Sequence, residues 1–229
     1  MTFKASEPFI FYSSLHLVEL TGIRAASLPE LAGHIRAIGS SSIYYHTHQF
    51  VRQHLYLTPE PPNDFAYWVS DVLGDKRLGE ALSAIDIMAY PSIGSIREAL
   101  ISTIEGALEE RPRLKNLTAP ESEEFNFLKS TGFIFSTGYK ADTLDEFSNY
   151  LRLVSLDSIY FHMFEARLRL ERPSNDFSNW IAISLGEEEL AVNVARIDPY
   201  THTGEGIRAT ILKILDIHLH RSGNNNGKA

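Results

Sequence analysis

SSIYYHTHQF occupies residues 41–50, and DSIYFHMFEA occupies residues 157–166. Both segments contain Ser-Ile-Tyr, one further aromatic residue and then a histidine. His46 and His162 therefore hold the same place in each segment. This motif occurs twice, each time with a histidine among aromatic residues, and it raises the question of what the two histidines do.

The repeated phrase belongs to a longer series of matches along the chain. The matched segments keep the same order in both halves, which predicts an internal tandem duplication of a unit of about 100 residues. They include TGIRAASLPEL (21–31) with TGYKADTLDEF (137–147), and NDFAYW (63–68) with NDFSNW (175–180). The predicted division is repeat 1 at 1–110, a charged, proline-containing linker at 111–122, repeat 2 at 123–220 and a flexible polar tail at 221–229.

Each repeat is predicted to be mainly α-helical. Ser27 with Glu30, and Thr143 with Glu146, have the spacing of a capping box, in which the hydroxyl and the glutamate each satisfy a backbone N–H. Apolar residues then recur at helical spacing. Further helix caps are expected at Ser41 and Asp157, and at Asn63 and Asn175 or the aspartate that follows each of them.

A short strand is an open alternative at the start of each repeat. Phe9 and Phe11 alternate there, as do Phe125 and Phe127, although SEEFNFLKS (122–130) is equally able to begin a helix. The expected fold class is mainly α, with two tandem helical repeats related by a pseudo-two-fold axis, as in homodimers.

His46 and His162 fall within apolar stripes when their segments are placed on helices, so both are expected to be buried. A buried imidazole needs hydrogen-bond partners. The favoured interpretation is that each histidine bonds an acid or a carbonyl in the core of its own repeat. The alternative is that the two share a ligand, a metal ion or a haem, because neutral imidazoles suit transition metals. The candidate acids are Asp64 and Asp176, or Asp86 and Asp198.

Several neighbours of the histidines also have both a structural and a functional interpretation. His48 is expected at the surface, because residues i and i+2 of a helix point about 200° apart. Glu165 is four residues before Arg169, which favours a helical salt bridge over metal binding. The candidate ligand-binding residues are His46, His162, Trp68, Trp180, Glu165, Arg167 and His202.

Composition excludes several classes of function. The 229 residues have a formal net charge of −8, which disfavours nucleic-acid backbones and anionic membranes. The chain has no cysteine, so disulfides, thiolate metal sites and cysteine nucleophiles are excluded. No segment is long and apolar enough to span a bilayer, and the start does not resemble a signal peptide, so a cytoplasmic location is expected. No phosphate loop or nucleophile elbow is present, and neither a catalytic residue nor a cofactor is predicted.

The motifs TG-x-[RK]-A-x-[ST]-L, SIY-[YF]-H and NDF-x-x-W together resemble an uncharacterised family of prokaryotic helical proteins that carry a domain of unknown function. The resemblance extends over both repeats. It implies a soluble prokaryotic protein and supplies no activity, cofactor or site residues.

The function favoured by these patterns is that of a non-enzymatic interaction or scaffold protein, with a protein partner or a homo-oligomer. Most of what the two halves share is typical of helix caps and core, whereas an enzyme usually has unshared polar residues that converge on one cleft. The alternatives are a protein that binds a small ligand, metal or haem through the paired histidines, and an enzyme with its site in repeat 2 only.

Overall fold

The computed structural model describes residues 4–49, 63–87, 89–166, 174–197 and 202–225. The chain divides into two compact units. Unit 1 comprises Met1–Leu15 and Phe133–Ala229, and unit 2 comprises His16–Gly132. The first strand segment of the chain is therefore packed with helices from its second half. The repeats expected at 1–110 and 123–220 are each continuous in sequence. Unit 1 instead combines the first 15 residues with residues 133–229, and unit 2 is the segment between them.

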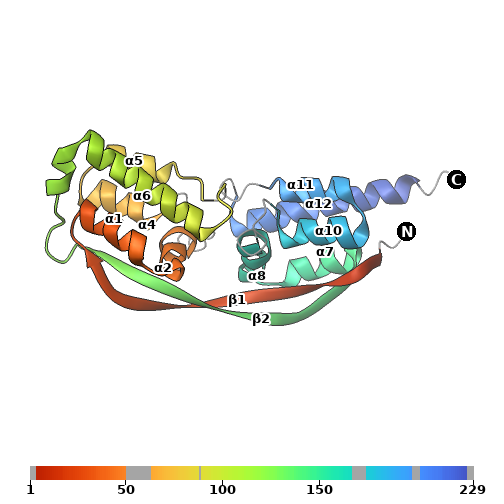
Figure 1. Cartoon of the computed structure of the whole chain (residues 1–229). Helices are drawn as coiled ribbons and strands as arrows, with labels where there is room; N and C mark the ends of the chain where they lie inside the picture. Colours follow the sequence, from red (N-terminus) through yellow and green to blue (C-terminus); the bar gives the residue numbers. More distant parts are fainter. Residues whose placement is uncertain (1–3, 50–62, 88, 167–173, 198–201, 226–229) are drawn as a thin grey trace. The chain divides into compact units, whose positions relative to one another are not determined.

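Two long antiparallel strands run through both units. β1 spans Lys4–Ala25 and β2 spans Phe125–Thr143, and together they form a two-stranded sheet (Figure 1). The predicted mainly-α class with helical repeats is wrong, since strands of 22 and 19 residues make this an α+β fold. The strands that the sequence allowed were short, and the observed ones extend well beyond the alternating phenylalanines.

The Thr-Gly pairs explain why the strands are longer than the pattern indicates. Gly22 and Gly138 lie inside the strands with φ of 78° and 84°. Glycine adopts this left-handed backbone without a steric cost, so each strand continues through its glycine. The Thr21 hydroxyl donates to the carbonyl of Phe127 at 2.6 Å, and the Thr137 hydroxyl donates to the carbonyl of Phe11 at 2.8 Å. Each threonine thus ties the two strands together beside its glycine.

In unit 2, helices cover one face of the strand pair, and Phe125 and Phe127 are buried against them. The helices are α1 (Leu28–Ala37), α2 (Ser40–Tyr44), the π-helical turn η1 (Tyr45–Gln49), α4 (Asp64–Tyr67), the π-helical turn η2 (Trp68–Val72), α5 (Lys76–Ser83), α6 (Ile93–Glu110) and the 3₁₀ turn η3 (Pro112–Asn116).

Unit 1 repeats this plan with Phe9 and Phe11 as the buried strand residues, and their rings pack against Phe147 and Phe177. The helices are α7 (Leu144–Leu153), α8 (Leu156–Tyr160), the π-helical turn η4 (Phe161–Glu165), α10 (Asp176–Leu185), α11 (Glu188–Ala195) and α12 (Gly204–Asn225). None of the helices in the described ranges is both long and apolar enough to cross a membrane.

Most of the expected helix starts are confirmed. Thr143 and Glu146 form the complete capping box, and the Ser27 hydroxyl accepts from the Glu30 amide. The caps expected at Ser41 and Asp157 are both wrong by two residues, because the N-cap of α2 is Gly39 and that of α8 is Ser155. Asn63 and Asn175 cap α4 and α10 as predicted.

The segment 111–122, which was predicted to be a linker, contains a 3₁₀ turn and buried contacts. Leu114 of η3 is buried, and the Ala119 amide donates to the Ala26 carbonyl at 2.7 Å. This segment is therefore fastened to the start of α1. At the other end of the chain, α12 continues past His220 to Asn225.

Candidate functional site

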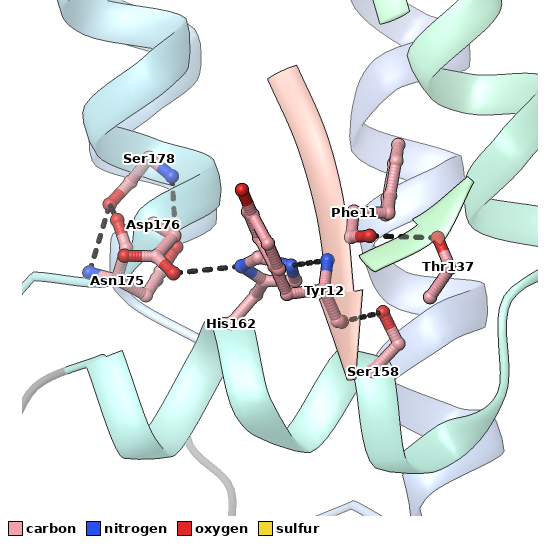
Figure 2. Close-up of polar contacts among 8 residues, drawn as sticks. All are labelled: Phe11, Tyr12, Thr137, Ser158, His162, Asn175, Asp176 and Ser178. Carbon is pink, nitrogen blue, oxygen red and sulfur yellow. Dashed lines mark hydrogen bonds and ion pairs between the residues drawn. The ribbon is translucent and has the colours of Figure 1, made fainter. Parts of the chain in front are cut away.

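His162 lies at the centre of a hydrogen-bond chain in unit 1. Its Nδ1 is 2.7 Å from Oδ2 of Asp176, and its Nε2 accepts the backbone N–H of Tyr12 at 2.8 Å (Figure 2). Because an amide N–H only donates, Nε2 is the unprotonated nitrogen, and the ring proton lies on Nδ1 and points at the carboxylate. Both ring nitrogens of the buried imidazole are thus engaged.

Ser158, one helical turn before the histidine, binds the other polar group of the same strand residue. Its hydroxyl donates to the Tyr12 carbonyl at 2.6 Å (Figure 2). In an antiparallel pair, the N–H and C=O of alternate residues point away from the partner strand. Ser158 and His162 therefore take the place of a third strand, and they satisfy an edge position that is otherwise open.

Unit 2 contains the same arrangement around His46. Its Nδ1 is 2.7 Å from Asp64 Oδ2, and its Nε2 accepts the Leu128 amide at 2.9 Å. The Ser42 hydroxyl donates to the Leu128 carbonyl at 2.6 Å. In the motif Ser-Ile-Tyr-[Tyr/Phe]-His, the serine and the histidine therefore bind the backbone C=O and N–H of one strand residue. That residue is Tyr12 in unit 1 and Leu128 in unit 2.

The tryptophans extend the same contact toward the start of each strand segment. Trp180 Nε1 donates to the Glu7 carbonyl at 2.7 Å, and Trp68 Nε1 donates to the Glu123 carbonyl at 2.8 Å. We refer to Ser158, His162 and Trp180 as the strand clamp of unit 1, and to Ser42, His46 and Trp68 as the strand clamp of unit 2. In each unit the clamp residues bind a strand segment that is far from them in sequence.

The Asn-Asp-Phe motif orients the histidine. Asn175 caps α10 and accepts from the Ser178 amide, which places Asp176 in the first turn beside the imidazole. A carboxylate is favoured at that end of a helix. Phe177 then packs against the His162 ring at a centroid distance of 5.3 Å. One short motif therefore supplies the cap, the carboxylate and an apolar wall.

In unit 2 the Asp64 carboxylate, which pairs with His46, also affects the pKa of the neighbouring Tyr45 hydroxyl. Burial raises the pKa of Tyr45, and the negative charge of Asp64 raises it further. The Asp64 side chain is 34% exposed and the His46 side chain 3%. The histidine is thus enclosed while its acid remains in contact with solvent.

The comparisons with known proteins agree with the motif resemblance. The model of a family of unknown function, DUF5752, matches residues 6–216. The chain belongs to this family. Among solved structures, this DUF5752 chain is similar to OrfY from Thermoproteus tenax, with 30% identity and a TM-score of 0.78 over 93% of this chain and 96% of that one. A search of curated proteins finds no match.

The prediction that both histidines are buried, with Asp64 and Asp176 as partners, is confirmed. Asp86 is not the acid that bonds His46, and Asp198 lies outside the described residues. The prediction that His48 is at the surface is wrong, since it is 2% exposed. The π-helical turn changes the angular spacing of η1, and the His48 ring stacks on Tyr44 at 5.2 Å.

The remaining candidate residues of the DUF5752 chain do not gather in one place. Trp68 and Trp180 belong to the two strand clamps. Glu165 is buried and accepts from the Ser14 hydroxyl at 3.3 Å, while His202 is exposed ahead of α12. Arg167 and Arg169 lie outside the described residues. Within the described ranges, no group of three or more His, Asp or Glu side chains is arranged to hold a metal ion.

Sequence reasoning missed the serine of the repeated phrase and the threonine of the Thr-Gly pair. Both bind strand carbonyls, in unit 1 through Ser158 and Thr137. The available signal was the spacing, because a serine four residues before a histidine shares its helical face. The acceptors could not be predicted, because they are backbone carbonyls of a distant segment and every residue has one.

Unit 1 also has an open pocket of about 370 Å³ beside its strand clamp. The pocket walls are mostly apolar, and the Asp176 carboxylate and the His162 imidazole supply the polar part. The lining residues are Pro8, Phe9, Ile10, Tyr12, Ile134, Phe161, His162 and Asp176.

Proposed function

We propose that this protein is a non-enzymatic interaction protein that binds its partner through exposed apolar side chains of β1 and β2. One observation carries the proposal. Of the 14 large apolar side chains that are exposed in the described residues, nine lie on the two strands. They are Ile10, Tyr12, Leu15, Leu17, Val18, Leu20, Phe133, Ile134 and Phe135. Soluble monomers rarely expose an apolar surface of this kind without a partner for it.

The polar residues of the clamps support a binding role over a chemical one. His162 has both ring nitrogens engaged, by Asp176 and by the Tyr12 amide. An imidazole held in this way offers no free lone pair to a metal ion or haem unless the strand leaves it. The alternative of a ligand shared by the paired histidines is therefore less well supported than a structural role. A cytoplasmic location remains our expectation from composition.

The proposal is tested with a photo-crosslinking amino acid at Phe133, and with the same amino acid at Leu153 of α7 as the control. Both side chains are more than half exposed, and both belong to unit 1. We expect a defined partner to be crosslinked from position 133 and not from position 153. Binding of the purified partner should be lost in the double variant Phe133→Glu, Phe135→Glu and kept in Leu153→Glu, Ile183→Glu. Equal crosslinking from both positions, or unchanged binding by the strand variant, would refute the proposal.

A second candidate is the binding of a small apolar ligand in the pocket beside Tyr12 and Asp176. Its support is the combination of apolar walls with very few polar groups, which is usual for ligand sites. The substitution Ile134→Trp should fill the pocket and abolish binding of Nile red there, whereas Ile183→Trp should not. If Nile red binds both variants equally, the pocket is not a ligand site.

We also infer that the protein arose by internal duplication of a strand-and-helix unit. The support is the recurrence of whole contacts, such as the capture of Tyr12 by His162 and of Leu128 by His46. Arg97 and Arg208 add another, since each donates to the last carbonyls of the first helix in its unit. A prokaryotic source remains a prediction, and the similarity to OrfY from Thermoproteus tenax is compatible with it.

A further inference from the structure

The helices of each unit bind a strand segment of six residues in the same way. The segments are Glu7–Tyr12 in unit 1 and Glu123–Leu128 in unit 2. The clamp tryptophan donates to the carbonyl of the first residue, and the clamp serine and histidine bind the C=O and N–H of the last residue. Any residue other than proline offers these backbone groups. The clamp therefore fixes the position and direction of the segment without selecting its side chains.

Selection comes from the third and fifth residues of the segment, which are phenylalanine in both units. They are Phe9 and Phe11 in unit 1, and Phe125 and Phe127 in unit 2, and all four are at most 6% exposed. The first ring of each pair contacts the clamp histidine, the clamp tryptophan and the phenylalanine of the Asn-Asp-Phe motif. The two sites therefore have matching aromatic walls, and a smaller side chain would leave a cavity there.

The remaining positions of the segment differ between the two units. The fourth residue is Ile10 in one unit and Asn126 in the other, and both are exposed. The sixth is Tyr12 or Leu128, and the clamp binds each of them through its backbone (Figure 2). Alternate side chains of an extended segment point to opposite sides, so the third and fifth face the helices together. In peptide recognition by strand addition, main-chain bonds provide affinity and pockets for alternate side chains provide specificity.

We infer that the helices of unit 1 form a recognition site for an extended peptide of the pattern x-x-Phe-x-Phe-x, with such a segment of a partner protein as its ligand. In this structure the chain's own residues 7–12 occupy the site. Unit 2 supports the inference, because a segment of different sequence meets the same requirements there. A segment of the same chain has a high effective concentration, so the partner competes with residues 7–12 for the site.

This inference goes beyond the proposed function. It depends on the buried Phe9 and Phe11 and on the helices that cover them, whereas the proposed function depends on exposed side chains such as Phe133. The crosslinking experiment at position 133 therefore tests the proposed function alone, and either idea can fail without the other.

Peptide binding to the full-length variant Phe9→Ala, Phe11→Ala tests the inference, because this variant weakens the chain's own segment and leaves the helices unchanged. In fluorescence anisotropy, a labelled peptide of residues 5–15 should bind the variant, and unlabelled peptide 121–131 should displace it. Peptide 5–15 with alanine in place of both phenylalanines should bind at least about 100-fold more weakly, because two buried rings are lost. The matched peptide with Ile10→Asn should bind within about threefold of the original, because this side chain is exposed.

NMR of tryptophan labelled with ¹⁵N shows where the peptide binds. The Trp180 indole belongs to the site, and the Trp68 indole belongs to the other unit and serves as the reference. In the variant, the peptide should slow the exchange of the Trp180 indole N–H and leave that of Trp68 unchanged. In the wild type, the peptide should bind much more weakly, since residues 7–12 already fill the site.

The variant remains informative if it does not fold by itself. A ligand that binds only the folded state stabilises that state, so peptide 5–15 should then restore the circular dichroism of the folded chain and the alanine peptide should not. Three results would overturn the inference. They are peptide binding that is equal in wild type and variant, equal binding of the alanine peptide, and a variant, folded or unfolded, on which peptide 5–15 has no effect.

Discussion

The substitution His162→Ala tests the strand clamp most severely. It removes the acceptor of the Tyr12 amide and the donor to Asp176, and it leaves a cavity in the aromatic core of unit 1. A lost neutral hydrogen bond costs about 1 kcal/mol, and one to a charged group about 1.5–3 kcal/mol. With the cavity included, we expect the free energy of unfolding to fall by about 3–5 kcal/mol.

Hydrogen exchange followed by NMR shows where the loss occurs. Each unit has one tryptophan, and each indole N–H donates to a strand carbonyl. In His162→Ala, the Trp180 indole and the Tyr12 amide should exchange much faster, while the Trp68 indole of the other unit serves as an internal reference. Urea unfolding measures the total loss. His220→Ala is the control, because this histidine is exposed and its removal should change stability by less than about 0.5 kcal/mol.

Two milder variants separate the two hydrogen bonds if the alanine variant does not fold. His162→Asn keeps a donor near the position of Nδ1, and His162→Gln keeps an acceptor near that of Nε2. Each should lose about 1–3 kcal/mol, and each should be more stable than the alanine variant. A loss below about 1 kcal/mol in His162→Ala, or equally faster exchange at Trp68, would show that the clamp does not hold the strand as inferred.

Three further changes have defined outcomes. Ser158→Ala removes the donor to the Tyr12 carbonyl and should cost about 1 kcal/mol in urea unfolding, whereas an unchanged midpoint would show that water replaces the hydroxyl. Gly138→Ala forces a side chain into a left-handed strand position and should cost about 1–2 kcal/mol, while Gly106→Ala in α6 should be neutral or stabilising; equal effects would contradict the assigned backbone role. Burial would raise the pKa of Asp75, but the hydrogen bonds from Arg111 and from the Leu78 amide, together with the charges of Arg111 and Arg113, outweigh it, so the pKa is lowered. A lowered pKa in the folded protein gives stability that is present above the unfolded value near 4 and is lost as the pH falls through the folded value. Asp75→Asn should therefore reduce stability at pH 7 and flatten its dependence on pH below about 4, and parallel stability–pH curves for variant and wild type would refute this.

The sequence predicts the local parts of this fold well. Helix caps such as Asn175 and Thr143 were correct because a cap depends on residues within one turn. The burial of His162 also followed from helical spacing, and Asp176 was one of its two candidate acid partners. These features depend on short-range chemistry, which a single sequence contains.

The exchange of strand segments between the two units was not predictable in this way. Phe9 and Phe11 have the same alternation whichever helices they pack against, so the sequence does not show that they join helices from residues 144–225. The length of the strands was hidden by Gly22 and Gly138, which resemble strand ends and instead lie inside the strands. The partners of His46 and His162 on the strands are backbone amides, and every residue other than proline has one.

The protonation state of the two histidines tests the central claim most directly. A two-bond ¹H–¹⁵N correlation spectrum of the imidazoles distinguishes a ring that is protonated at Nδ1 from one protonated at Nε2 or at both nitrogens. With the amides of Tyr12 and Leu128 as donors, His162 and His46 should both be neutral, with the proton on Nδ1 and Nε2 as acceptor. A proton on Nε2 of either ring would contradict the claim, because that histidine could then not accept the strand amide.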